Sequence, residues 1–86
     1  MNRILVVRVS SLGSTVSPET PLGGEVLDRV KLVARASRRL SRLWGSPSAR
    51  VQIEWPGGRA VLRVSEEETI AIIASNREPV LEASTP

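Results

Sequence analysis

Few side chains in this sequence could do chemistry. Cys and His are both absent, which removes thiolate and imidazole metal ligands and the commonest nucleophiles and bases. The densest carboxylate group is Glu66, Glu67 and Glu68. Three neighbours at a strand turn splay apart, and no second acidic cluster faces them. The triplet therefore predicts neither a metal site nor an acid/base pair.

Two further segments contain residue types that occur in nucleophilic or phosphate-binding sites. Ser10 and Ser11 follow an apolar strand, but the sequence offers no general base to activate them. Leu22, Gly23 and Gly24 lack both the Gly-Lys-Ser/Thr ending and the preceding long strand of a phosphate loop. We therefore expect no catalytic residue, no cofactor and no metal, which describes a protein that is not an enzyme.

The composition is that of one small soluble domain. A chain of 86 residues with 41% hydrophobic content allows one core, because domains usually have roughly 100–150 residues. The net charge of +3 is ordinary for solubility alone. Trp44 and Trp55 are the only aromatics, so nucleic-acid bases would find few stacking platforms. The apolar run Ile4 to Val7 is too short for a signal peptide or a membrane span, so we expect a cytoplasmic protein without membrane insertion.

Two segments, residues 3–9 and 69–74, are nearly continuous apolar runs. Such runs are typical of central strands that are covered on both faces. We expect them to be neighbours at the centre of an antiparallel sheet.

Three other segments complete this sheet. Residues 51–55 alternate apolar with polar side chains, and in residues 59–64 Ala60, Leu62 and Val64 alternate with Arg59, Val61 and Arg63. The turn residues 56–58 join the two segments as a hairpin. Thr15 to Ser17 is a brief edge strand, which follows a turn at Gly13, a residue that can take a positive φ, and is stopped by Pro18.

Between these strands, residues 25–44 change to a helical period. Gly45 and Pro47 end the helix. Its apolar stripe recurs at intervals of three and four residues: Val26, Val30, Val33, Ser37, Leu40 and Trp44. The order is ββαβββ, which predicts an α+β fold with a five-stranded antiparallel sheet and one long helix packed on a face.

The apolar side of this helix is wider than a helix on a sheet needs. Leu32, Ala36 and Leu43 extend the stripe on one flank, and Leu27 and Ala34 extend it on the other. Together they cover roughly 220°, against about 100° for an ordinary surface helix. The excess favours a partner subunit. The alternative is that the flank residues simply border the core.

The opposite side of the helix is basic. Lys31, Arg35, Arg38 and Arg42 form a stripe that could neutralise phosphates. The alternative function is therefore a small basic nucleic-acid-binding module. Asp28 lies beside the stripe and no base-reading motif accompanies it, so a solvated helix face is favoured.

The chain resembles the roadblock family of dynein light chain-like domains. The likeness lies in ILVVRVSSLGSTVS from Ile4 to Ser17, the long Ala/Leu/Arg helix, and VQIEWPGGRAVLRVSEEETIAIIAS from Val51 to Ser75. Those domains have a five-stranded antiparallel sheet with a central helix between strands two and three, and longin and profilin-like folds share part of this architecture. We divide the chain into a roadblock-like domain over 1–76 and a short irregular tail over 77–86.

Family members usually carry a helix before the first strand, and many carry another after the last strand. Neither fits this sequence, so the chain resembles a minimal roadblock core. The resemblance implies a homodimer that pairs the helices of two subunits and joins their third strands, here Arg50 to Trp55, into one sheet. The implied interface residues are Val30, Val33, Ala34, Ser37, Leu40, Val51, Ile53 and Trp55.

Proteins of this family commonly act as non-catalytic partners or regulators of Ras-like small GTPases, or as scaffold subunits. The resemblance therefore implies a dimeric adaptor that needs no cofactor. Its partners would be a second copy of itself and a small GTPase or another scaffold protein.

Overall fold

The computed structural model describes residues 3–80, and it has the predicted α+β class and the order ββαβββ. The elements are β1 (Arg3–Ser10), β2 (Gly13–Ser17), α1 (Gly23–Arg42), β3 (Ser48–Trp55), β4 (Gly58–Ser65) and β5 (Glu68–Ser75). Residues 77–80 belong to no helix or strand. The rest of the predicted tail, residues 81–86, lies outside the described residues.

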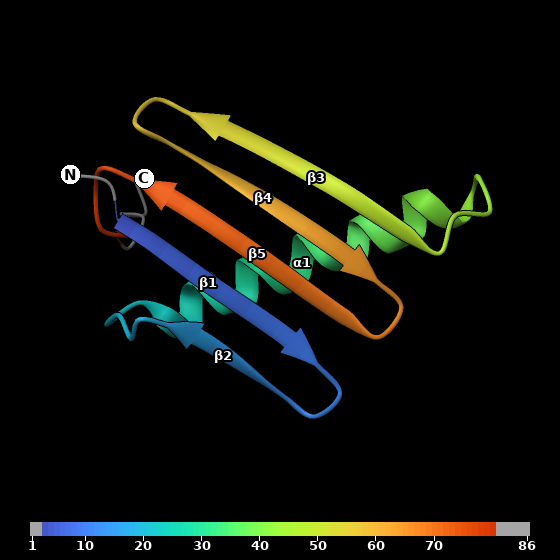
Figure 1. The fold of residues 1–86 in the computed structure, drawn as a ribbon, viewed down its shortest axis with the longest axis horizontal. Helices are drawn as coiled ribbons and strands as arrows, with labels where there is room; N and C mark the ends of the chain where they lie inside the picture. Colours follow the sequence, from blue (N-terminus) through green and yellow to red (C-terminus); the bar gives the residue numbers. More distant parts are fainter. Residues whose placement is uncertain (1–2, 81–86) are drawn as a thin grey trace, which may run out of the picture.

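The five strands form one antiparallel sheet in the order β2-β1-β5-β4-β3 (Figure 1). β1 and β5 pair along their whole length, from Arg3 opposite Ser75 to Ser10 opposite Glu68. The expectation that the two richest apolar strands are central neighbours is therefore confirmed. The edges of the sheet are β2 and β3.

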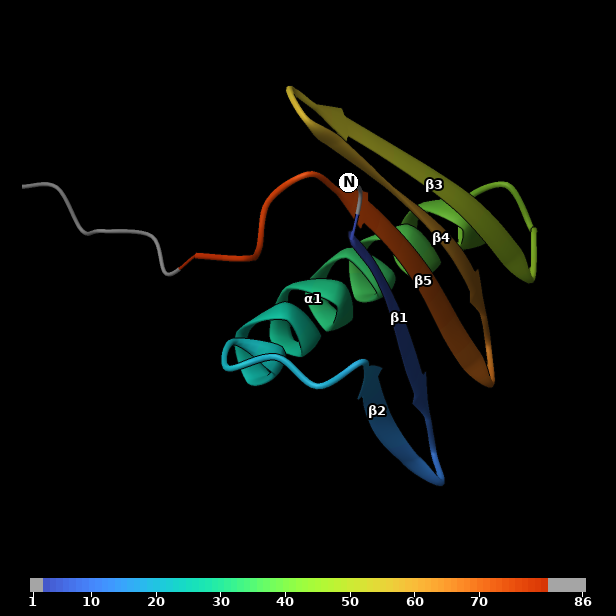
Figure 2. The same cartoon turned by 60° about the vertical axis from the view of Figure 1, so that its left-hand side comes forward.

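The core lies between this sheet and α1, which covers one face (Figure 2). Val7, Ala71 and Leu62 stand in one row across the three central strands. From the helix, Val30 and Ala34 pack into the same cluster. Because successive side chains of a strand point to opposite faces, this row determines which alternate side chains of each strand face the helix.

The other face of the sheet has no second layer within residues 3–80 (Figure 2). Ile4, Val6 and Ile72 point to this side and are 56%, 40% and 50% exposed. The expectation that β1 and β5 are covered on both faces is therefore wrong. They are central in the sheet, but the one helix of the described chain can cover only one side.

The turns and the helix end follow the glycine signals in the sequence. Gly13 in the β1–β2 turn has φ 142°, and Gly45 after the helix has φ 68°. Beyond Gly45 the N–H of Ser46 donates to the carbonyl of Ser41, and Gly45 N–H donates to Arg42, both at 3.0 Å. This pair of bonds is a Schellman motif, which satisfies carbonyls at the helix C-terminus.

Candidate docking surfaces

α1 and the two residues that follow it leave large apolar side chains in solvent. The helix passes behind the sheet from the β2 side and emerges past β3 (Figure 1), so its last turns have no strand over one side. We call this surface the helix flank: Leu32, Leu40, Leu43 and Trp44, which are 54%, 58%, 76% and 76% exposed. Leu32 and Leu43 belong to one flank of the over-wide apolar side seen in the sequence, whereas Leu40 and Trp44 belong to its central stripe.

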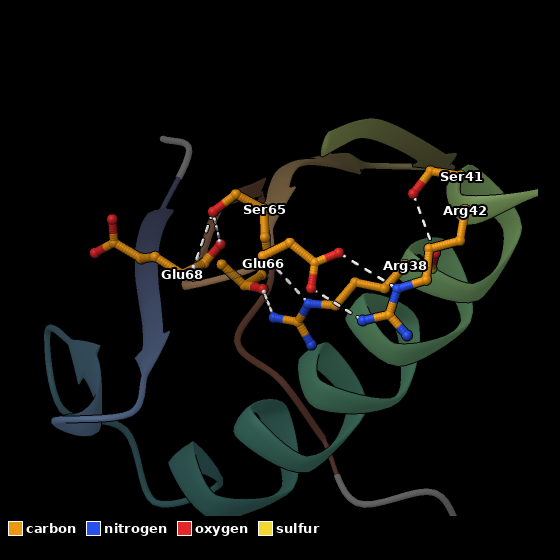
Figure 3. A network of polar contacts seen from close by, with 7 residues as sticks. Arg38, Ser41, Arg42, Ser65, Glu66 and Glu68 are labelled. Carbon is orange, nitrogen blue, oxygen red and sulfur yellow. Dashed lines mark hydrogen bonds and ion pairs between the residues drawn. The ribbon is translucent and has the colours of Figure 1, made fainter. Parts of the chain in front are cut away.

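Two arginines tie the opposite side of the helix to the β4–β5 turn (Figure 3). Arg38 Nε donates to the carbonyl of Ser65, and its Nη2 donates to Thr69 Oγ1, both at 2.9 Å. Arg42 Nη2 donates to Glu66 Oε2 at 2.9 Å. Because these contacts hold one side of α1 against the sheet, the helix flank is turned outward.

The Arg42 contact also changes the titration of its partner. The hydrogen bond from Arg42, with its positive charge, holds the pKa of Glu66 below the usual value for a glutamate. The same hydrogen bond raises the pKa of Arg42. The side chains of Arg42 and Glu66 are 59% and 50% exposed. Solvent therefore screens the pair, and its contribution to stability is small.

These contacts divide the basic stripe of the helix. Arg38 and Arg42 are engaged by the protein's own sheet, whereas Lys31 and Arg35 are exposed. Within residues 3–80 neither Lys31 nor Arg35 has an ion pair. Half of the surface considered for nucleic acid is thus already bonded, which leaves two of the four side chains for phosphates.

The edge strand β3 lies beside the helix flank. Within residues 3–80 it pairs with β4 alone, so no described strand uses the hydrogen-bonding groups along its other edge. Ile53 and Trp55, which point to the helix side, are each 39% exposed. A groove of about 300 Å³ between α1 and β3 is lined by both of them and by Val33. The groove runs along the N-terminal half of α1, and none of the four helix-flank residues lines it.

The interface residues expected from the sequence are divided by the fold. Leu40, Ile53 and Trp55 are exposed, and they are joined by the half-buried Val33, Ser37 and Val51. Val30 and Ala34, however, are 6% and 2% exposed and pack on the protein's own sheet. These two have no surface to offer a second subunit, because the side of the helix that carries them faces the sheet, whereas the side that carries Leu40 faces outward.

A second apolar surface was not predicted from the sequence, although the sequence contains its signal. We call it the open face, the uncovered side of the sheet. The runs Ile4–Val7 of β1 and Ile70–Ala74 of β5 place apolar side chains at successive positions, so about half of these side chains had to face away from α1. Its apolar members are Ile4, Val6, Val61, Ile70, Ile72 and Ala74.

No described residues assemble a catalytic constellation. Glu66 bonds Arg42, whereas Glu68 pairs with Arg8 at 3.2 Å, so the acidic triplet diverges as expected. No group of His, Cys, Asp and Glu in residues 3–80 is placed to hold a metal. A hollow of about 750 Å³ at one end of the sheet is mainly apolar. Its charged lining residues are Arg3, Glu19, Arg77 and Glu78, of which Arg3 and Glu78 bond each other.

α1, the one helix of the described region, is not long and apolar enough to cross a membrane.

No family model, curated protein or solved structure matches the chain. The resemblance to roadblock domains therefore stays a prediction that rests on the sequence pattern.

Proposed function

We propose that this chain is a dimeric, non-enzymatic adaptor that docks other proteins. The observation that carries the proposal is the exposed helix flank beside the unpaired edge of β3. An open strand edge next to apolar side chains is a template for pairing with another chain, and contiguous exposed apolar surface marks interaction sites.

The order of charges along β3 favours a second copy as the occupant. Arg50, Gln52 and Glu54 share one face of this strand and are exposed. If two β3 strands pair antiparallel about a two-fold axis through Gln52, Arg50 of each copy stands opposite Glu54 of the other. Opposite charges in directly facing positions stabilise a strand pair. A two-fold axis makes the contact occur twice.

The same pairing uses the apolar side of the strand. With Gln52 on the axis, Val51 of one copy stands opposite Ile53 of the other, and both belong to the helix side of the sheet. Strand pairing alone buries little area, whereas stable interfaces bury about 1,200–2,000 Å² in total. The helix flanks, which lie on this side of the joined sheet, supply the additional apolar surface.

The partner class comes from the resemblance to roadblock domains. It implies a Ras-like small GTPase or another scaffold subunit as the protein that such a dimer binds. The nucleotide and its chemistry would belong to the partner, which agrees with a sequence that lacks Cys and His.

Charge exchange on β3 tests the dimer. Light scattering on the wild-type chain at tens of micromolar should give twice the mass of 9.3 kDa. Glu54→Arg places Arg50 of each copy opposite the new arginine at position 54 of the other copy. The repulsion occurs twice across the β3–β3 contact, so this variant should be a monomer. The double exchange Arg50→Glu with Glu54→Arg restores opposite charges and should restore the dimer.

The outcome that would refute the dimer is a wild-type monomer, or a single variant that dimerises as well as the double exchange. Glu54 stands opposite Arg59 within the chain, so a thermal melt of each variant checks that the monomer remains folded. The adaptor role is then tested by titrating the dimer with the small GTPases of the same genome, loaded with GDP or GTP. Absence of binding at micromolar concentration to every one of them would contradict the GTPase proposal.

A further inference from the structure

The open face has an apolar strip that follows the central strand. Ile70, Ile72 and Ala74 of β5 form its middle line. On one side Val6 stands opposite Ile72, and on the other side Val61 does. Ile72 is 50% exposed, which is unusual for a large aliphatic side chain at the centre of a sheet.

Arginines border this strip on both sides. Arg8 and Arg63 stand on either side of Ile70, and Arg59 stands beside Ala74. Arg50 extends the row beyond Arg63. With Glu54 and Glu68 on the same face, four arginines and two glutamates leave a net charge of +2.

Three of these arginines are not neutralised within the chain that the structure describes. Arg8 pairs with Glu68 at 3.2 Å, but Arg50, Arg59 and Arg63 have no ion pair among residues 3–80. Arg50 and Arg63 even face each other across β3 and β4. Like charges in that position destabilise a sheet. Glu54 of a second copy stands opposite Arg50 in the proposed dimer, so Arg63 is the member of this pair that is left for an acidic partner.

We propose that the open face binds an amphipathic helix of another protein, one whose apolar stripe is flanked on both sides by Asp or Glu. The strip and its borders have the dimensions of such a ligand. β5 has eight residues and spans about 27 Å, which is the length of roughly 18 helical residues. A helix laid along β5 buries the strip and brings its flanks to Arg8 on one side and Arg59 and Arg63 on the other.

Other occupants fit these observations less well. Two open faces packed against each other would bring +2 against +2 and bury unpaired guanidinium groups, which is costly. Nucleic acid would meet an apolar centre without a single aromatic side chain. The open face lies on the side of the sheet away from α1, so this proposal does not rest on the dimer of the preceding subsection.

Two synthetic peptides test the proposal by fluorescence anisotropy. Each has about 18 residues with a leucine stripe, and the flanks carry Glu in one and Lys in the other. The Glu peptide should bind in the micromolar range and weaken as salt rises, whereas the Lys peptide should bind at least tenfold more weakly. Ile72→Glu and Arg63→Glu should each weaken the Glu peptide at least tenfold, and Leu43→Glu on the helix flank should not.

Three results would overturn the proposal. The first is no binding of the Glu peptide, or equal binding of both peptides. The second is a change of oligomeric state by Ile72→Glu, which would make the open face a contact between copies. The third is Ile72-dependent binding to vesicles of phosphatidylcholine and phosphatidylserine without peptide binding. Because both residues are solvent-exposed, thermal melts should show folded variants, and Arg63→Glu tests the face even if Ile72→Glu is unstable. A failure of the Glu54→Arg test would remove the dimer and leave these results unchanged.

Discussion

The two faces of the sheet carry similar apolar side chains but have different surroundings. Beneath α1, Val7, Leu62 and Ala71 are sealed at 0%, 2% and 0% exposure. On the open face, Val6 and Ile72 occupy equally central strands and remain 40% and 50% exposed. Central position in a sheet therefore does not ensure burial, because a covering layer is also needed.

The largest expected effect is a difference in stability between substitutions on the covered face and on the open face. Leu62→Ala leaves a cavity under the helix and should lower the free energy of unfolding by about 2–5 kcal/mol. Ile72→Ala on the open face removes a side chain that solvent already reaches, so we expect a loss below about 1 kcal/mol. Urea denaturation measures both. Equal losses would show that the open face is packed in solution.

The polar contact within the covered face should rank next. Thr69 is fully buried, and its hydroxyl accepts a hydrogen bond from Arg38. Thr69→Val keeps the shape but removes the acceptor, so we expect a loss of about 1–2 kcal/mol in the same assay. Thr69→Ser is the matched control, because it keeps the hydroxyl. A valine variant as stable as the wild type would contradict the role of this bond.

On the open face, one substitution should raise the free energy of unfolding instead of lowering it. Arg63→Glu converts the like-charge pair with Arg50 into an opposite-charge pair, so we expect stability to rise by about 0.5 kcal/mol while binding of the acidic peptide is lost. A thermal melt measures the gain. If this variant is instead destabilised, Arg63 supports the fold and its exposure is not evidence for a ligand.

The smallest effect concerns the Arg42–Glu66 contact. Because the pKa of Glu66 is lowered in the folded state, the contact contributes stability at neutral pH, and this is lost as pH falls through the lowered pKa. Glu66→Gln should therefore be slightly less stable than wild type at pH 7 and equal to it in acid below that pKa. Urea midpoints across pH 2–7 test this. A difference that persists in acid would assign the effect to packing.

Much of the fold could be predicted because its signals are local. The glycine at 45, the helical period of residues 25–44 and the alternation in residues 51–55 each depend on neighbours in the chain. The helix and the strand both formed, although α1 begins and ends two residues earlier than predicted, at Gly23 and Arg42. β3 begins at Ser48, three residues before the predicted start at Val51. The prediction began too late because Ser48 to Arg50 shows no alternation of apolar and polar side chains.

The surfaces were harder to predict because they depend on distant residues. Helical spacing placed Val30, Ala34 and Leu40 within one broad apolar side, but only the position of the sheet decides that the first two are buried. In the same way, Arg38 and Arg42 read as part of a solvated stripe, since Ser65 and Glu66, which bond them, lie more than twenty residues away.

The bonds of Arg38 have a further consequence for α1. A helix whose apolar side spans roughly 220° can roll about its own axis and still bury apolar surface, so hydrophobic contact alone leaves several orientations close in energy. The two directional bonds from Arg38 to Ser65 and Thr69 are satisfied in only one of them. Arg38 thus selects a single rotational setting, and by doing so it decides which leucines of the helix the rest of the molecule leaves for a partner.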